Sequence, residues 1–393
     1  MPAQFRHDGE QSQTACPYIN GNPRINLRSH RPPCLLLRTQ ERWNTVRSDS
    51  SVLPPANTIP SSAGAISKVV LGCMSYGNPK WWVLDEEEAS KHIKAAWDAG
   101  INAFDTANAY SNGDSEEVLG RAIKKYKLPR DAIVVMTKVY FPVSRDETQP
   151  VPPGPTTDAE GYVNQYGLSR KHIFDSVKHS LRRLQLDYID LLQCHRFDYN
   201  TPIEETMQAL HDVVKAGYVR YIGMSSCHAW QFNVMQSYAI ANKLTPFISM
   251  QNHYNLLYRE EEREMFPTLK HFGVGSIPWS PLARGALTRP LDKQNTTPRA
   301  ESDEVEEIAK KRDISMAQVS VAWAISKEGV SAPIVGSTSL ANLTEAIAAV
   351  HIKLTEEEIT YLEEPYLPMT VLGHFQCFQV DLFSIPRLVP RGY

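Results

Sequence analysis

Hydrophobic and polar positions follow two distinct periods along the chain from Lys68 onward. Short apolar runs rich in β-branched residues are typical of buried strands, and apolar positions that recur every three or four residues are typical of amphipathic helices. The short runs predict strands at residues 69–73, 101–105, 132–138, 188–194, 219–225, 247–252, 274–279 and 332–335. The longer stretches predict helices at residues 86–99, 115–126, 169–186, 203–216, 229–242, 260–272, 315–327 and 339–350.

Glycines stand at or near the ends of four predicted helices, at Gly100, Gly217, Gly273 and Gly329. Helices commonly end on a left-handed residue, a conformation that glycine adopts without steric cost. The alternation of eight strands with eight helices predicts parallel strands with helical crossovers. We therefore expect an α/β fold, a (β/α)8 TIM barrel over residues 66–375, with two extra helices at 302–312 and 355–364.

The two ends of the chain and one internal loop depart from this pattern. Residues 1–65 lack apolar periodicity and are rich in Arg, Ser, Asn and Pro, so we expect a disordered extension there. Residues 376–393 are expected to form a C-terminal tail. Residues 141–168 contain five prolines and predict a long irregular loop after the third strand. In a barrel this loop lies over the C-terminal mouth, where substrates bind.

Charge and cysteine content narrow the choice of partners. The formal net charge is -3, and the sequence has no concentrated basic face that would favour nucleic acid or an anionic membrane. The six cysteines lie far apart, which favours neither a metal site nor a disulfide framework. The scattered cysteines favour a reducing, intracellular compartment, and no long apolar run is present, so we expect a soluble cytoplasmic protein. A monomer is the default expectation.

Ionisable residues interrupt three buried strands at the same end of the predicted barrel. Asp105 ends the second strand, Lys138 ends the third, and His195 follows the fourth. Taken singly, such residues are more often caps, ion pairs or structural histidines, but their joint occurrence at the catalytic rim favours an active site. Tyr110 follows Asp105 closely enough to enter the same mouth. A Lys/Asp pair beside it would stabilise the phenolate and bring the tyrosine pKa toward the physiological range, which suits general acid–base catalysis.

The motifs around these four residues resemble the aldo-keto reductases, closest to the branch of aryl-alcohol dehydrogenase-like and versiconal hemiacetal acetate reductase-like proteins. They read Phe-Asp-Thr-Ala-Asn-Ala-Tyr at 104–110, Thr-Lys-Val at 137–139 and Leu-Leu-Gln-Cys-His at 191–195. The resemblance spans residues 66–375. It implies that Tyr110 is the general acid, that Lys138 and Asp105 tune it, and that His195 orients the carbonyl or shares the proton.

The resemblance also implies a nicotinamide cofactor, NADPH with NADH not excluded. Ser225 and Gln251 would bind the carboxamide, and Trp279 would stack on the nicotinamide. The loop after the seventh strand would wrap the pyrophosphate, and the entry to the last barrel helix would hold the adenosine phosphate and adenine. The residues that the resemblance assigns to these two segments are Ser280, Leu282, Arg284, Gly336, Ser337, Thr338, Asn342 and Glu345.

The chain departs from the family pattern at several positions. Many members carry Lys or Arg where this chain has Gly336 and Asn342, and those cations contact the 2′-phosphate of NADPH. Ser226 replaces an Asn beside the carboxamide. Family members begin with a hairpin that closes the N-terminal end of the barrel, whereas the residues before Ile66 do not resemble one. That end of the barrel is therefore expected to lack its cover unless part of the N-terminal arm supplies it.

Three functions compete at this stage. The first is reduction of an aromatic or polyketide-type aldehyde or ketone to the alcohol. The substrate walls would then include Tyr140, Phe141, Phe197 and Tyr254. The second is a nicotinamide-binding partner or sensor subunit with little turnover, which only the Arg-rich arm supports. The third, a metal-dependent barrel hydrolase or lyase, lacks a convergent cluster of ligands on the strand ends.

Overall fold

The computed structural model describes residues 58–59, 66–78, 83–145, 156–290 and 304–374. The predicted disordered extension lies almost wholly outside the described residues, and the C-terminal tail lies entirely outside them. Part of the loop expected over 141–168 and the first residues of the helix expected at 302–312 also lie outside.

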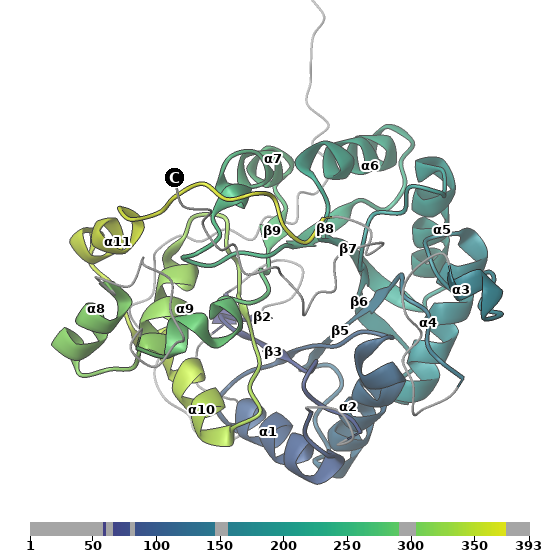
Figure 1. The fold of residues 1–393 in the computed structure, drawn as a ribbon. Helices are drawn as coiled ribbons and strands as arrows, with labels where there is room; N and C mark the ends of the chain where they lie inside the picture. The colour runs from purple at the N-terminus through teal and green to yellow at the C-terminus, as the bar shows by residue number, and fades with distance from the viewer. Residues whose placement is uncertain (1–57, 60–65, 79–82, 146–155, 291–303, 375–393) are drawn as a thin grey trace, which may run out of the picture. The chain divides into compact units, whose positions relative to one another are not determined.

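Eight parallel strands form one sheet in the order β10-β3-β4-β5-β6-β7-β8-β9. Parallel bridges Ser276↔Val330 and Trp279↔Ile334 join its two outer strands, so the sheet closes into the predicted (β/α)8 barrel, seen along its axis in Figure 1. The strands are β3 (Val70–Gly72), β4 (Ala103–Asp105), β5 (Val134–Val139), β6 (Ile189–Cys194), β7 (Val219–Ser225), β8 (Phe247–Gln251), β9 (Gly275–Ser276) and β10 (Ile334–Val335).

A helix follows each barrel strand and packs outside it (Figure 1). These helices are α1 (Glu86–Asp98), α2 (Asp114–Lys125), α4 (Arg170–Leu184), α5 (Ile203–Lys215), α6 (Ala229–Ala241), α7 (Met265–Phe272), α9 (Met316–Ser326) and α10 (Leu340–Ala348). The two extra helices are confirmed as α8 (Glu304–Arg312) and α11 (Glu356–Glu363). A short helix, α3 (Thr156–Ala159), lies in the loop after β5. The four glycines predicted at helix ends all have positive φ, between 68° and 94°.

The helix predicted over 260–272 is interrupted. Its first residues form a 3₁₀ turn, η2 (Glu260–Glu262), and α7 begins afresh at Met265. Pro267 supplies a physical reason, because proline has no backbone N–H and clashes with the preceding turn inside a helix. The new start places Pro267 in the first turn of α7, where proline is tolerated.

A short hairpin lies at the N-terminal end of the barrel, whereas the sequence predicted none there. Strand β1 (Thr58–Ile59) pairs antiparallel with β2 (Ile66–Ser67). Ile66 packs against the apolar cluster inside the barrel, which comprises Val70, Ala103, Met136, Leu191, Ile277, Ala332 and Ile334. A short hairpin that the sequence pattern did not reveal therefore adds a side chain to this end of the core.

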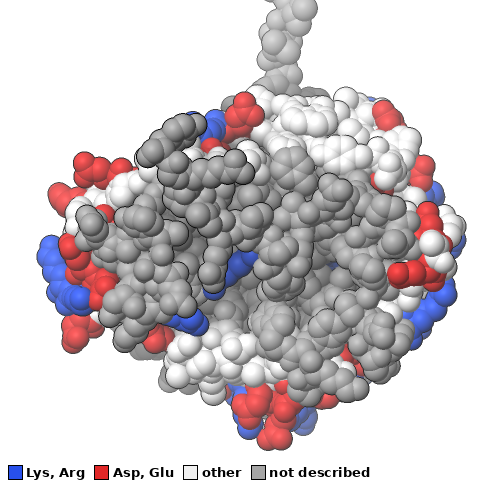
Figure 2. All heavy atoms as spheres, viewed as in Figure 1, with Lys and Arg blue, Asp and Glu red and all other residues white. Residues whose placement is uncertain are grey.

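Charges of both signs are interspersed over α1, α8 and α11 on the face shown in Figure 2. The ion pair between Glu116 and Arg183 differs from these surface charges because it is largely buried. Arg183 Nε of α4 donates to Glu116 Oε2 of α2 at 2.6 Å, and Thr137 Oγ1 of β5 donates to Glu116 Oε1 at 2.5 Å. The Glu116 side chain is fully buried. This contact ties two helices to the strand that carries Lys138.

The buried pair predicts a large loss of stability on Glu116→Gln. The variant keeps an acceptor for Thr137 but leaves the Arg183 cation buried without its counter-ion, a loss of about 3–5 kcal/mol in unfolding free energy. Equilibrium urea unfolding followed by circular dichroism measures it. Glu328→Gln is the control, because Glu328 pairs with Lys270 on the exposed surface, where such pairs contribute little. Equal unfolding free energies for the two variants would contradict the prediction.

Candidate active site

Alternation along the strands places polar residues on the inner face of the barrel at its C-terminal end. Ala103, Met136 and Leu191 face the interior cluster, and successive side chains of a strand point to opposite faces. Asp105, Lys138 and Gln193 each stand two residues further along, so they share that inner face. The apolar floor thus gives way to a polar layer where the strands end.

Lys138 is the centre of this polar layer. Its ammonium Nζ donates to Asp105 Oδ2 at 2.5 Å, to the Thr106 carbonyl at 2.9 Å and to Tyr110 Oη at 3.2 Å. The side chains of Lys138 and Asp105 are 0% and 3% exposed. Three of the four residues predicted as a catalytic cluster therefore meet through one buried cation.

Tyr110 is held by the turn that it begins. It opens the 3₁₀ segment η1 (Tyr110–Gly113), in which Ser111 and Asn112 adopt left-handed backbone angles with φ of 46° and 56°. Ser111 Oγ donates to the Tyr76 carbonyl at 2.9 Å, and Asn112 exchanges two hydrogen bonds with the Ser144 backbone. Left-handed non-glycine residues persist where their surroundings fix them, so these contacts hold the phenol in the mouth.

His195 completes the cluster through ring contacts. Its ring lies edge-on to Tyr110, with centroids 5.7 Å apart, and to Phe141, with centroids 5.0 Å apart. Burial, together with the cations of Arg196 and Lys138, lowers the pKa of His195 well below its usual value. The imidazole is therefore neutral near pH 7, and its buried Nδ1 has no hydrogen-bond partner.

The sequence predicted that the Tyr110 pKa is lowered, and this prediction is wrong for the chain without a bound ligand. Burial raises the pKa of Tyr110, and the nearby Lys138 ammonium opposes this shift without overcoming it. For Lys138, burial lowers the pKa, but the Asp105 carboxylate and Tyr110 outweigh it, so its pKa is raised. At neutral pH the cluster thus holds a protonated phenol beside a charged ammonium, which is an arrangement suited to proton donation.

Gln193, which is not among the predicted site residues, lies directly beside the cluster. Gln193 Nε2 donates to Asp105 Oδ1 at 2.9 Å, and Gln251 Nε2 donates to the same oxygen at 2.9 Å. Gln193 is fully buried. Its signal was available, since it is a polar residue two positions beyond Leu191 on the inner face of a buried strand.

The residues predicted to bind the nicotinamide end lie at the ends of β7, β8 and β9. Ser225 Oγ donates to the Gln251 carbonyl at 2.7 Å. Ser226 N donates to Asn252 Oδ1 at 2.8 Å, and Trp279 Nε1 donates to Ser226 Oγ at 3.2 Å. Ser226, the departure from the family pattern, thus supports the indole of Trp279. The side-chain amide of Gln251 also reaches Asp105. It therefore lies between the residues predicted to bind the nicotinamide and the predicted catalytic tetrad of Asp105, Tyr110, Lys138 and His195.

Trp279 is backed by aromatic stacking. His253 stacks on it with centroids 4.2 Å apart, and Tyr258 stacks on the His253 ring at 4.7 Å. Asn255 Nδ2 donates to His253 Nε2 at 3.0 Å, and burial lowers the pKa of His253 to about 4. The stack fixes the indole plane, as a surface for a flat heterocycle requires.

The two predicted phosphate segments follow β9 and β10. Ser280, Leu282 and Arg284 belong to a turn in which Ser280, Ala283, Arg284 and Gly285 all have positive φ. Gly336, Ser337 and Thr338 follow β10 and precede α10, whose N-terminus Ser339 caps by accepting from Asn342 N. Asn342 and Glu345 lie within α10. Helix N-termini and tight turns of this kind present backbone N–H groups that suit phosphate oxygens.

The structure explains why position 336 holds glycine where many family members have Lys or Arg. A Cβ at this position would lie 2.9 Å from the Gly72 carbonyl oxygen. Because backbone atoms cannot move aside cheaply, a longer side chain would separate β10 from β3. Asn342 is exposed and could accept a cation without such a clash.

Side chains predicted as substrate walls divide into two groups. Phe141 contacts the His195 ring, so it lies at the mouth, and Tyr140 contacts Phe141. Tyr140 also packs against the main core cluster, and Phe197 is a buried member of it. Tyr254, in contrast, is fully buried and stacks on Trp323 in a second core cluster, so its prediction as a wall residue is wrong. It follows β8 on the face that points away from the interior.

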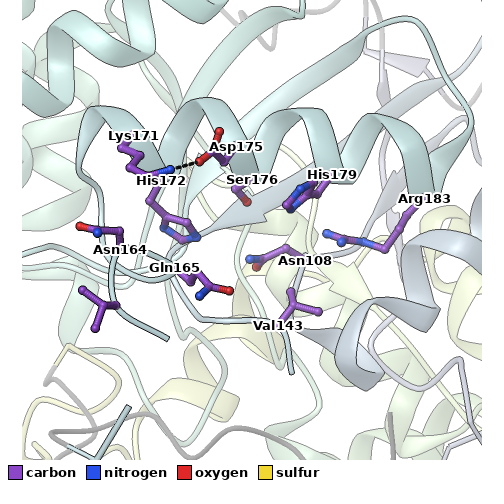
Figure 3. A pocket seen from close by; sticks show the side chains of 11 residues that line it. Asn108, Val143, Asn164, Gln165, Lys171, His172, Asp175, Ser176, His179 and Arg183 are labelled. Atoms are coloured by element: carbon purple, nitrogen blue, oxygen red, sulfur yellow. Dashed lines mark hydrogen bonds and ion pairs between the residues drawn. The ribbon is translucent and has the colours of Figure 1, made fainter. Parts of the chain in front are cut away.

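A separate hollow of about 320 Å³ lies between α4 and the segments around Asn108, Val143 and Asn164 (Figure 3). No tetrad residue lines it. On α4, Lys171 pairs with Asp175 at 2.6 Å. The chemistry described above thus lies outside this hollow.

The residues of the mouth fit a nicotinamide dinucleotide. Four consecutive strands, β7 to β10, end in or are followed by the hydrogen-bonded pair Ser225 and Gln251, the indole of Trp279 and the two predicted phosphate segments. The buried Nδ1 atoms of His195 and His253 have no hydrogen-bond partner. In the part of the chain that the structure describes, no group of His, Cys, Asp and Glu could hold a metal ion, and no helix is long and apolar enough to span a membrane. Fold and site define an oxidoreductase on a TIM barrel.

Comparison with known proteins agrees with this class. The family model described as Aldo/keto reductase family matches residues 68–366, and the chain belongs to the aldo-keto reductase family, whose members use nicotinamide cofactors. It is 48% identical to versiconal hemiacetal acetate reductase of Aspergillus parasiticus over 328 residues, 78% of this chain and 95% of the relative.

Two further relatives are similarly close. A candidate aryl-alcohol dehydrogenase of Schizosaccharomyces pombe is 48% identical over 78% of this chain and 94% of its own. The aldo-keto reductase dtxS3 of Metarhizium robertsii is 47% identical over 79% and 90%. The resemblance seen in the sequence motifs, including its branch, is confirmed, and the chain is an oxidoreductase of carbonyl compounds.

The electrostatics of Tyr110 predict a pH dependence. A step that needs the phenolate, such as alcohol oxidation, appears only as the pH rises through the Tyr110 pKa, which burial raises. Lys138→Met removes the cation that lowers this pKa, so the rising limb of kcat/KM for alcohol oxidation should move about one pH unit or more to the alkaline side. The exposed Lys94 supplies the control variant, Lys94→Met. If the rising limb of kcat/KM stays in place in Lys138→Met, Tyr110 is not the group whose titration produces it.

Proposed function

We propose that this chain reduces an aldehyde or ketone to the alcohol reversibly, with NADPH as its preferred cofactor and Tyr110 as the general acid and base. The observation that carries the proposal is the contact of one buried ammonium, Lys138 Nζ, with both Asp105 and the Tyr110 hydroxyl at the C-terminal mouth of the barrel.

The chain's own groups supply the proton transfer. Tyr110 Oη holds a proton that can pass to the substrate oxygen, and Lys138 stabilises the phenolate left behind. His195 is neutral, so it orients the carbonyl through a hydrogen bond and does not act as a cationic acid. The bound nicotinamide would supply the hydride to the carbonyl carbon.

The cofactor would be held by the residues that the strands bring together. Ser225 and Gln251 would contact the carboxamide, and Trp279 would provide the stacking surface. Ser280, Leu282 and Arg284 would line the pyrophosphate. Gly336, Ser337, Thr338, Asn342 and Glu345 would face the adenosine half, where the N-terminus of α10 favours phosphate.

Aromatic side chains at the mouth favour an aromatic or polyketide-type carbonyl. Phe141 and His195 make an edge-on contact, and Tyr140 packs on Phe141. Rings of this kind bind flat apolar ligands well. The printed names of the relatives, which include a versiconal hemiacetal acetate reductase and an aryl-alcohol dehydrogenase, agree with this class. We propose a cytoplasmic monomer that acts on small molecules, with neither nucleic acid nor membrane as a partner.

Tyr110→Phe tests the mechanism. The variant keeps the ring that packs on His195 and removes only the hydroxyl, so kcat for 4-nitrobenzaldehyde reduction should fall about 10²- to 10⁴-fold while NADPH binding is retained. The loss of NADPH absorbance during turnover measures kcat, and quenching of tryptophan fluorescence by NADPH measures cofactor binding.

Two outcomes of that assay argue against the proposal. Full turnover in Tyr110→Phe would exclude Tyr110 as the acid. No turnover by the wild-type chain on a panel of aromatic and polyketide-like carbonyls, with a stoichiometric partner co-purifying, would favour the nicotinamide-binding sensor subunit.

Cofactor choice is tested at Asn342. We expect a higher kcat/KM with NADPH than with NADH, and Asn342→Lys should lower the KM for NADPH about threefold or more by pairing with the 2′-phosphate. Asn342→Gln is the neutral control. The KM for NADH should not change in either variant, and an equal effect on both cofactors would place the 2′-phosphate elsewhere.

A further inference from the structure

The carboxylate of Asp105 is held by three side-chain donors from three other strands. Lys138 of β5 donates to Oδ2, whereas Gln193 of β6 and Gln251 of β8 both donate to Oδ1 at 2.9 Å. All four side chains are buried. In barrels of this kind, residues of alternate strands share a layer, and β4, β6 and β8 are alternate strands in the order of this sheet.

The hydrogen bonds fix which way the Gln193 amide points. A carboxylate only accepts, so Nε2 of Gln193 must face Asp105. Its Oε1 then accepts from Gln251 Nε2 at 2.7 Å. The three side chains close a hydrogen-bonded triangle in which neither glutamine amide can flip without facing two acceptors or two donors toward each other.

The backbone supports this triangle. Gln193 and Lys138 are register partners of β6 and β5, so the amide and the ammonium stand level on neighbouring strands and reach different oxygens of one carboxylate. On the other side, Gln193 is the register partner of Gly223. A Cβ at Gly223 would lie 2.4 Å from Ser249 Oγ and 3.4 Å from Gln193 Cγ, so the absence of a side chain there leaves room for this layer.

We propose that Gln193 is a positioning residue for proton transfer. It holds Asp105 Oδ1, which keeps Oδ2 on Lys138 and Lys138 Nζ on Tyr110 Oη. It also couples the Asp105 carboxylate to Gln251. The inference deepens the proposed function and rests on it, since it concerns the same reaction. Gln193 itself touches no reacting atom in this arrangement.

The first test compares two buried glutamines. Gln193→Leu removes the donor to Asp105 and the acceptor for Gln251. Gln236→Leu is the matched control, because the Gln236 amide also makes two hydrogen bonds, with the Phe247 backbone at 3.0 and 2.8 Å. Phe247 stands at the opposite end of β8 from Gln251. We expect kcat for aldehyde reduction to fall about 10- to 100-fold in Gln193→Leu, with KM for the aldehyde within about threefold of wild type. Gln236→Leu should keep its kcat.

The second test uses pH and separates positioning from a merely structural role. In Gln193→Glu a protonated carboxyl can donate to Asp105 Oδ1 and accept from Gln251, which reproduces the native contacts. Once ionised, it can no longer donate and faces a second carboxylate. Burial and the Asp105 charge raise the pKa of the introduced carboxyl, and the Lys138 ammonium on the neighbouring strand opposes them in part. Activity should therefore approach wild type at acidic pH and fall as the pH rises through that pKa, a limb that the wild-type enzyme lacks.

The outcomes distinguish this inference from the proposed function. If wild type reduces carbonyls and both Gln193 variants keep wild-type kcat and pH profile, Gln193 does not position Asp105. If Gln193→Leu does not fold, the pH profile of Gln193→Glu decides. If wild type itself shows no turnover on any carbonyl, the proposed function has failed. The inference is then tested by the pH titration of Tyr110, measured as the ultraviolet absorbance difference between a protein and its Tyr110→Phe variant. An unchanged Tyr110 titration in Gln193→Leu would overturn the inference.

Discussion

The buried ion pair between Lys138 and Asp105 is the interaction on which the site depends. Bringing both charges out of water is costly, and such a pair is tolerated only where geometry and further hydrogen bonds satisfy the remaining atoms. Here the ammonium has three acceptors and the carboxylate has three donors. The barrel supplies these partners because four parallel strands end at the same level, which no single helix or loop could arrange.

The properties of the neighbouring groups follow from this pair. The ammonium beside Tyr110 offsets part of the burial that raises the Tyr110 pKa, and the same cation helps to keep His195 neutral. The carboxylate in turn anchors Gln251, which belongs to the predicted nicotinamide side. Burial thus sets the direction of both pKa shifts and the charge pair modifies them, while Asp105 connects the groups predicted to transfer the proton to Gln251 on the predicted nicotinamide side.

Much of this arrangement could be predicted from the sequence. The two periods of apolar residues identified all eight barrel strands and their helices, and the ionisable strand ends identified Asp105, Lys138 and His195. The pattern could not predict the β1–β2 hairpin, since paired strands of two residues carry too little periodicity to detect. Nor could it give the sign of the Tyr110 pKa shift, which depends on the balance between burial and one charge at 3.2 Å. Tyr254 was misplaced because aromatic type alone does not tell which face of a strand end it occupies.

A double-mutant cycle on Asp105→Asn and Lys138→Met tests the dependence on the ion pair most directly. If the two residues act on Tyr110 as one unit, each single substitution removes most of their joint effect on kcat/KM. The kcat/KM of the double variant should then lie close to that of the less active single variant. Losses that multiply, so that the double variant is slower by the product of the two single effects, would show that Asp105 and Lys138 act independently and would contradict this account.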